Sequence, residues 1–221
     1  MEGIVLQTID YKEKSKLVYL YTPFGMESIK ALDASKSKLG FITTLNVVEY
    51  EKTNSKLPTV MEYSLKKSYY SYYTHLDKMS VIVPMIDVVK HLEEEAPHYR
   101  IYPFFLECLD LIDDHNPLYI LSLFLIKMLS VFGVKPRLAN CVFCGRTSIV
   151  NFSIKDGGAL CNFCSNENFS NQKLHHAFQM LYHKKEYGDE PILDISYKDL
   201  LEAIYSYYAL HANLKLKSYK L

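Results

Sequence analysis

Four cysteines arranged in two pairs constrain this chain more than any other feature. The two C-x-x-C pairs are separated by sixteen residues, and their members are Cys141, Cys144, Cys161 and Cys164. A C-x-x-C turn brings two sulfurs to one edge, and two such edges complete the tetrahedron that Zn²⁺ adopts. The spacing therefore predicts one zinc ion. A pair of redox dithiols, or a site that has lost its metal, are the alternative interpretations.

The residues around the pairs favour the zinc interpretation. Gly145 follows the second cysteine, where a tight turn is easiest for a residue that tolerates positive φ. Gly157 and Gly158 precede the third cysteine and indicate the turn of a small hairpin. A site with four sulfur ligands has no open position for water or substrate, so the zinc is expected to be structural and not catalytic. We therefore look for function in the surfaces that the metal organises.

Composition limits the class of protein. The chain has 221 residues, of which 49% are hydrophobic, and its formal net charge is zero. It is long enough and apolar enough to form a sizeable core, and it is neither a disordered chain nor a simple polycation. The fifth cysteine, Cys108, stands in an apolar helical run and is expected in the core.

The sequence also predicts where the protein works. Cysteines used for zinc rather than for disulfides suit the reducing cytoplasm. The N-terminus has no basic-then-apolar signal peptide. The most apolar stretch, residues 118–132, contains Lys127 and is shorter than the about 20 residues that a membrane span requires. We therefore expect a cytoplasmic protein with no membrane partner.

The first 72 residues are expected to form a β-domain. Short apolar or alternating runs, punctuated by turn residues, predict five strands near residues 4–6, 17–21, 27–32, 41–50 and 59–65. Five short strands in so small a domain favour a barrel of the OB type. Four tyrosines between Tyr69 and Tyr73 follow. They are expected to pack at a domain junction, with stacking on nucleic-acid bases as the alternative.

The rest of the chain is predicted to be helical. Apolar residues recur at helical spacing over residues 79–92, 102–112 and 118–132, and Ser170 and Ser196 are candidate caps for two further helices. The predicted class is a multidomain α+β fold. Its parts are an OB-type barrel at 1–72, a helical domain at 73–138 and 166–221, and an inserted zinc module at 139–165.

Motifs for catalysis are scarce. The sequence has no phosphate-binding loop, dinucleotide-binding glycine motif, metalloprotease helix or serine-hydrolase elbow. His91 and Glu93, followed by a C-x-x-C pair, match part of the zinc deaminase pattern, in which H-x-E precedes C-x-x-C. However, Asn140 rather than proline precedes the first pair, and the deaminase pattern leaves the second pair unexplained. We therefore expect no enzymatic activity, and a zinc hydrolase or deaminase would require an open coordination position.

Lysines are the remaining candidates for a functional surface. One group alternates with other residues into the second predicted strand and is expected to share a face, and another surrounds the turn after the third strand. On a small barrel such residues can follow a phosphate backbone. The candidate DNA-binding residues are Lys12, Lys14, Lys16, Lys30, Lys36 and Lys38. An ordinary solvated surface is the alternative.

Four segments, in order along the chain, carry a family likeness. Residues 3–25 contain a strand, a Tyr-x-Glu turn, a second strand and a Thr-Pro turn that ends in glycine. Residues 37–50 form a later barrel segment, and residues 214–218 contain Leu-Lys-Ser. The most specific segment is 127–145, where a helix leads through Gly-x-x-Pro to the first C-x-x-C. Together these segments resemble the RecO family of bacterial recombination mediators.

The resemblance implies an OB-fold, a helical domain and a zinc module with four cysteine ligands. It also implies a non-catalytic role in recombination and repair through the RecF pathway. Members of this family are expected to bind single- and double-stranded DNA and to anneal complementary strands. They act with RecR to load RecA onto single strands coated by SSB, whose C-terminal tail they contact, and they associate with the nucleoid when acting. The alternative is a zinc-stabilised protein–protein adaptor without direct DNA binding.

Overall fold

The computed structural model describes residues 1–12, 14–33, 38–165 and 171–216 and divides into two compact units. The first unit contains Met1–Met79 and Val89–Leu109, and the second contains Ser80–Val88 and Asp110–Leu221. Two helices, α2 (Leu76–Lys90) and α3 (His98–Leu111), contribute residues to both units. Within the described residues, none of the helices has the length and apolarity that crossing a membrane requires.

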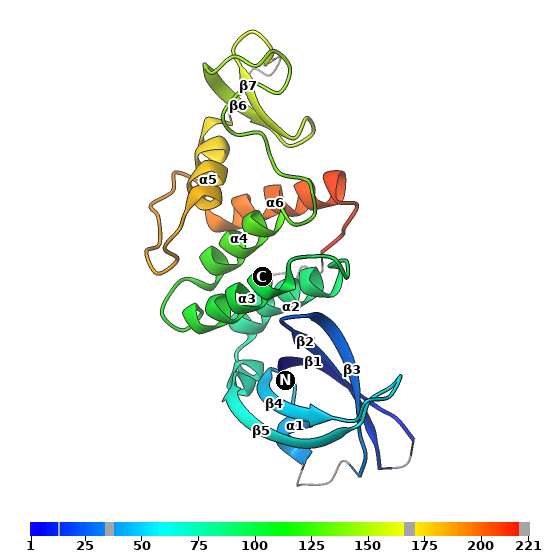
Figure 1. Cartoon of the computed structure of the whole chain (residues 1–221). Helices are drawn as coiled ribbons and strands as arrows, with labels where there is room; N and C mark the ends of the chain where they lie inside the picture. Colours follow the sequence, from blue (N-terminus) through cyan, green and yellow to red (C-terminus); the bar gives the residue numbers. More distant parts are fainter. Residues whose placement is uncertain (13, 34–37, 166–170, 217–221) are drawn as a thin grey trace. The chain divides into compact units, whose positions relative to one another are not determined.

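The first unit is built on a five-stranded antiparallel sheet in which the strand order is β3-β2-β1-β4-β5 (Figure 1). Its strands are β1 (Glu2–Asp10), β2 (Lys16–Thr22), β3 (Gly25–Ala31), β4 (Asn46–Lys52) and β5 (Val60–Ser68). Each lies at or near the position that alternation and turn residues predict, apart from the start of β4. All five strands contribute to one apolar core, which contains Val5, Val18, Ile29, Val48 and Val60.

The two outer strands of this sheet close it into a barrel. The backbone N–H of Lys30 in β3 donates to the carbonyl of Pro58 at 2.8 Å, and Lys30 forms a parallel bridge with Thr59, just before β5. The cyclic order is therefore β1-β2-β3-β5-β4, with β3 and β5 parallel at the closure. This is the topology of an OB-type barrel, and it confirms the predicted fold class.

The stretch between β3 and β4 corrects one prediction. Residues 41–50 were expected to form a single long strand, but Leu39–Ile42 form a short helix, α1, and the strand begins only at Asn46. The β-branched residues that follow Phe41 favour a strand by local propensity. Burial of Phe41 outweighs this propensity and favours the helix. The Phe41 ring packs in the barrel core, 5.8 Å from the ring of Tyr50 and 5.6 Å from that of Tyr63.

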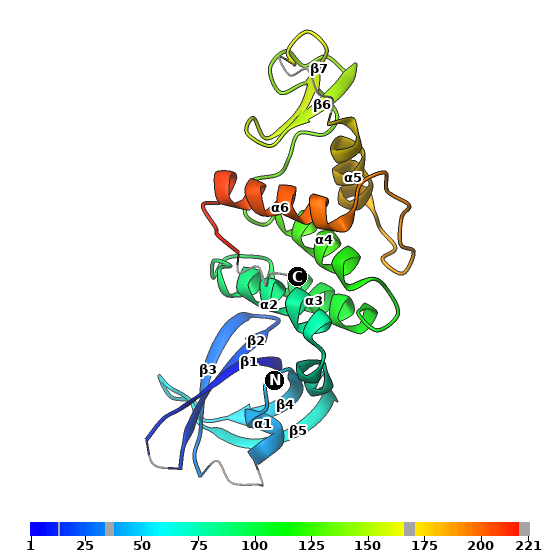
Figure 2. The same ribbon diagram turned by 180° about the vertical axis from the view of Figure 1, so that it is seen from behind.

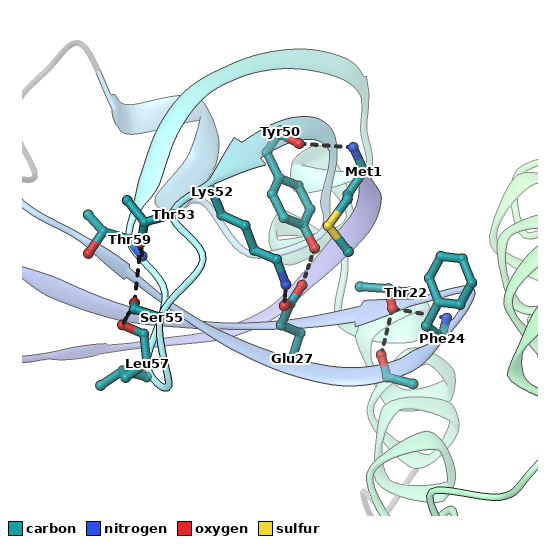
Figure 3. Close-up of polar contacts among 11 residues, drawn as sticks. Met1, Thr22, Phe24, Glu27, Tyr50, Lys52, Thr53, Ser55, Leu57 and Thr59 are labelled. Carbon is teal, nitrogen blue, oxygen red and sulfur yellow. Dashed lines mark hydrogen bonds and ion pairs between the residues drawn. The ribbon is translucent and has the colours of Figure 1, made fainter.

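Polar contacts around Tyr50 connect β3, β4 and the first residue of the chain (Figure 3). The Tyr50 hydroxyl donates to the Glu27 carboxylate, which also forms an ion pair with Lys52. The amino group of Met1 donates to the Tyr50 carbonyl at 2.9 Å, which ties the first residue to β4. Burial raises the pKa of Tyr50 to about 12, so this hydroxyl remains a donor at neutral pH.

Helix α3 packs on the barrel within the first unit. The ring of Tyr21 in β2 lies 5.7 Å from the rings of His98 and Tyr102, and the Tyr102 hydroxyl donates to Glu2 at 3.0 Å. The tyrosine run before α2 forms a 3₁₀ turn, Tyr70–Thr74. Tyr69 and Tyr72 are buried, whereas Tyr70 and Tyr73 are exposed.

The second unit surrounds a buried helix, α4 (Pro117–Met128), against which α5 (Gln172–His183) and α6 (Tyr197–His211) pack (Figure 2). Asn116 caps α4 by accepting from the backbone N–H of Leu118. The predicted cap Ser196 accepts from the N–H of Asp199 at 3.1 Å, which confirms that helix start. The other predicted cap, Ser170, lies outside the described residues.

The barrel core generates a stability prediction. Phe41→Ala should destabilise the protein by about 3–5 kcal/mol, because a buried aromatic side chain is replaced by a cavity. Phe24 is 82% exposed in the β2–β3 turn, so Phe24→Ala should change the free energy of unfolding by about 0.5 kcal/mol or less. Denaturant unfolding followed by circular dichroism would measure both. Equal effects of the two substitutions would contradict this assignment of the core.

Candidate metal centre

The four paired cysteines lie on two similar backbone turns. In the first turn the N–H of Gly145 donates to the Cys141 carbonyl at 3.0 Å, and Gly145 has a φ of +75°. In the second turn the N–H of Ser165 donates to the Cys161 carbonyl at 2.9 Å. The predicted role of the glycine after the first pair is confirmed, because a positive φ is strained for residues with a Cβ.

These turns bring the four sulfurs into one cluster. The Sγ atoms of Cys141, Cys144, Cys161 and Cys164 all lie within 4.8 Å of one another, and those of Cys144 and Cys161 are 3.5 Å apart. A tetrahedral ion with Zn–S bonds of ~2.3 Å needs sulfur–sulfur distances of ~3.8 Å, so the cluster fits such an ion. All five cysteines of the chain are free of disulfides, and Cys108 is buried in the first unit, as expected.

The electrostatics of the cluster favour a bound cation. Burial opposes ionisation of Cys141, but backbone N–H groups of Cys161 and Cys144 stabilise its thiolate and lower its pKa to about 6. A hydrogen bond with Cys144 is the main cause that raises the pKa of Cys164 to about 12. Burial also opposes ionisation of Cys161, but hydrogen bonds lower its pKa. Two close thiolates repel each other unless a positive ion compensates them. A bound metal ion removes this conflict, and its binding releases protons.

A hairpin of β6 (Ile149–Ser153) and β7 (Gly158–Cys161) carries the second pair of cysteines (Figure 1). The chain that enters the first turn runs alongside this hairpin. Arg137 donates its N–H to the Gly157 carbonyl at 3.1 Å, and the N–H of Ala159 donates to the Arg137 carbonyl at 2.8 Å. A Cβ on Gly158 would lie 2.4 Å from that carbonyl oxygen, so only glycine fits there.

The helices of the second unit hold the hairpin through rings and carbonyls. Phe152 stacks on Phe178 of α5 at 4.7 Å between ring centroids. His175 lies 2.8 Å from the Leu138 carbonyl, and His211 lies 2.6 Å from the Ile154 carbonyl. A carbonyl can only accept, so each imidazole presents an N–H there. Both histidines are structural contacts of the module and lie outside the sulfur cluster.

The structure corrects the expected placement of the first lysines. Lys12 and Lys14 do not alternate along a strand, because β1 ends at Asp10 and β2 begins at Lys16. They stand exposed in the turn between these strands, with φ angles of 53° and 56°. Lys16 forms an ion pair with Asp10 across the base of the turn.

The strand register nevertheless gathers the predicted lysines at one end of the barrel. Lys16 at the start of β2 pairs with Ala31 at the end of β3, so the β1–β2 turn and the segment after β3 leave the barrel at the same end. Lys30 pairs with the next residue of β2, and the ammonium of Lys38 donates to the Leu32 carbonyl. Lys36 lies outside the described residues.

Sequence reasoning did not single out two phenylalanines of the sulfur cluster's turns. Phe143 and Phe163 are each the third residue of a C-x-x-C pair, and both are largely exposed. Their equivalent positions were visible in the sequence, but only the structure shows that neither ring enters a core.

Comparison with known proteins decides the family. A family model described as "Recombination protein O C terminal" matches residues 74–220, which is more than half of the chain. The chain belongs to the RecO family. The match covers helices α2 to α6 and the four cysteines, and the barrel precedes it. The resemblance seen in the sequence is therefore confirmed, and membership supports a role in DNA repair and recombination.

Curated members of the RecO family extend the likeness over the barrel. The chain is 28% identical to the DNA repair protein RecO of Halalkalibacterium halodurans, over 98% of this chain and 91% of the relative. It is 31% identical to that of Thermoanaerobacter sp., over 79% of this chain and 74% of the relative. The DNA repair protein RecO of Clostridium perfringens is 30% identical, with 81% and 78% covered.

The cysteine cluster generates a prediction about metal content. Cys161→Ser should lower the metal bound per chain well below the one ion expected for the unsubstituted protein, because a closed site then lacks one of its ligands. Cys108→Ala should keep a full complement, since Cys108 is buried away from the cluster. Elemental analysis of the purified variants would measure this. Equal metal loss in both variants, or none in Cys161→Ser, would contradict the assignment.

Gly158 generates a second prediction at this site. Gly158→Ala should destabilise the second unit, because its Cβ would collide with the Arg137 backbone. Gly188→Ala is the matched control, since a Cβ at Gly188 meets no atom within 4 Å. Thermal unfolding of the metal-loaded proteins should show a lowered melting temperature for Gly158→Ala alone. A melting temperature equal to that of the unsubstituted protein would contradict the close approach.

Proposed function

We propose that this chain is a non-catalytic recombination mediator that binds single-stranded DNA and anneals complementary strands. The observation that carries the proposal is the strand register that gathers lysines at one end of an OB-type barrel. Barrels of this type bind single strands with a basic groove that follows the backbone. Membership in the RecO family supports the same role.

We further propose that the partners are those of the family. The protein would act with RecR to load RecA onto single strands coated by SSB and would contact the SSB C-terminal tail. It would also bind double-stranded DNA, and it would work in the cytoplasm at the nucleoid. The three-part division into a barrel at 1–72, a helical domain at 73–138 and 166–221, and a zinc module at 139–165 belongs to the same proposal.

We propose Zn²⁺ as the metal, because four thiolates in a tetrahedral arrangement select it. Cys141, Cys144, Cys161 and Cys164 would hold one ion. With four sulfur ligands the ion supplies no open coordination position, so its contribution is structural. The two turns and the hairpin would keep their arrangement only while the ion neutralises the thiolates.

A protein–protein adaptor without direct DNA binding is the second candidate. Two of the six candidate lysines favour the adaptor, because their ammonium groups already bind other groups of this chain. Lys16 pairs with Asp10, and the Lys38 ammonium donates to the Leu32 carbonyl. Of the other four, Lys30 is half-buried and Lys36 lies outside the described residues. Lys12 and Lys14, exposed in the β1–β2 turn, therefore best separate the two functions.

Salt dependence provides the test. Binding to phosphates releases counterions, so the logarithm of the affinity should fall linearly with that of the salt concentration. The double variant Lys12→Ala/Lys14→Ala should make this slope shallower by roughly 0.7 for each phosphate that a lysine no longer neutralises. Fluorescence anisotropy of a labelled single-stranded oligonucleotide, titrated at several salt concentrations, would measure it.

The double variant Lys173→Ala/Lys198→Ala is the matched control. It removes the same charge from exposed positions of α5 and α6 and should leave the slope unchanged. An unsubstituted, metal-loaded protein that binds no DNA at low salt, alone or with RecR, would exclude the mediator proposal and favour the adaptor.

A further inference from the structure

The turns that hold the cysteine cluster each present a phenylalanine to solvent. Phe143 is 63% exposed and Phe163 is 72% exposed, although phenylalanine is among the residues most often buried. No other large hydrophobic residue of the described segment 135–165 is exposed to a comparable extent. The two rings are therefore not part of a wider exposed apolar patch. They also do not belong to the core of the module, so its folding does not explain why phenylalanine stands at these positions.

Arg146 lies against the Phe163 ring, and Phe143 precedes it by three residues in the first turn. Its guanidinium lies 4.1 Å from the centroid of the Phe163 ring, although the two residues come from different turns. The Arg146 carbonyl accepts from the N–H of Cys141 at 2.8 Å, which fixes the backbone of this arginine against the cluster. We call Phe143, Arg146 and Phe163 the knuckle surface. It consists of two flat rings and one planar cation on a rigid base.

The charge around the knuckle surface is positive. Between residues 135 and 165 the chain has four basic residues, Lys135, Arg137, Arg146 and Lys155, and one acidic residue, Asp156. The Asp156 carboxylate is already engaged, because it accepts from the Ser153 hydroxyl at 2.7 Å. The whole chain is neutral, so this excess is local to residues 135–165. An anionic polymer is the partner that such a field attracts.

We propose that the knuckle surface stacks unpaired nucleobases of single-stranded DNA. Every base has a π-face, so a phenylalanine ring stacks on it without regard to sequence, and an arginine plane adds a cation–π contact. A protein-docking patch would instead need contiguous aliphatic area, which this surface lacks. The inference rests on the proposed function and adds a second contact region, separate in sequence from the barrel lysines.

The composition of the chain offers a direct measurement. The protein contains no tryptophan, so Phe163→Trp places a single tryptophan at the proposed site, which can be excited at wavelengths that the tyrosines do not absorb, while keeping an aromatic plane. Stacking on a base should quench its emission. Titration with an oligothymidylate should quench it, and an abasic strand of equal length and charge should quench it much less. Phe24→Trp, in the exposed β2–β3 turn, is the matched control and should respond equally weakly to both strands.

Affinity provides the second readout. Phe143→Leu/Phe163→Leu keeps apolar bulk and leaves the cysteines intact, but it removes both π-faces. Removing a stacking ring weakens binding by on the order of tenfold for each base. The double variant should therefore bind the oligothymidylate at least roughly tenfold more weakly, with unchanged metal content, and should bind the abasic strand as the unsubstituted protein does. Phe24→Leu should leave both affinities unchanged.

The outcomes separate the two proposals. If the unsubstituted protein binds the labelled strand but the leucine variant binds equally well and the tryptophan is not quenched, the knuckle surface does not stack bases. The mediator proposal would then stand, and a protein would be the better partner for the two rings. If the unsubstituted protein binds no strand in the anisotropy titration, both proposals are excluded. Loss of metal from the leucine variant would leave the quenching comparison as the deciding measurement.

Discussion

Four sulfur atoms confined within 4.8 Å of one another cannot all carry negative charge unless a cation lies among them. This constraint governs the module that β6 and β7 form. A two-stranded hairpin is marginally stable in water by itself, and its few buried side chains cannot make a core of their own. A bound ion, together with the contacts to α5 and α6, would supply what the hairpin lacks. Its conformation is thus tied to the protonation of four thiols as well as to packing.

The barrel follows a different principle. Its stability comes from strands wrapped around an apolar core, and the contacts of Lys30 with Pro58 and Thr59 close the ring. Closure also determines where the loops emerge, because the register of β2 and β3 places the β1–β2 turn and the end of β3 at the same rim. Function can therefore be changed in these loops without altering the core. The positions of the lysines are a consequence of strand pairing and not of a binding motif.

Local signals predicted the features that depend on nearby residues. The cysteine spacing predicted the cluster, because each pair is closed by a single turn, and Ser196 predicted a helix start, because a cap acts within one turn. Features that depend on distant contacts were missed. The α1 helix exists because Phe41 fills the barrel core, which strand propensity cannot show. The close approach of Gly158 to Arg137 likewise requires the three-dimensional fold.

The distribution of cysteines has an experimental consequence of its own. One thiol, Cys108, is sealed in the first unit, and the other four belong to a single cluster in the second. In the folded protein Cys108, Cys141 and Cys161 are buried, whereas Cys144 is exposed. Modification of a buried cysteine therefore reports an opening event, and its position on the chain identifies which unit opened. The order in which the cysteines become reactive would therefore reveal the hierarchy of local unfolding without any added probe.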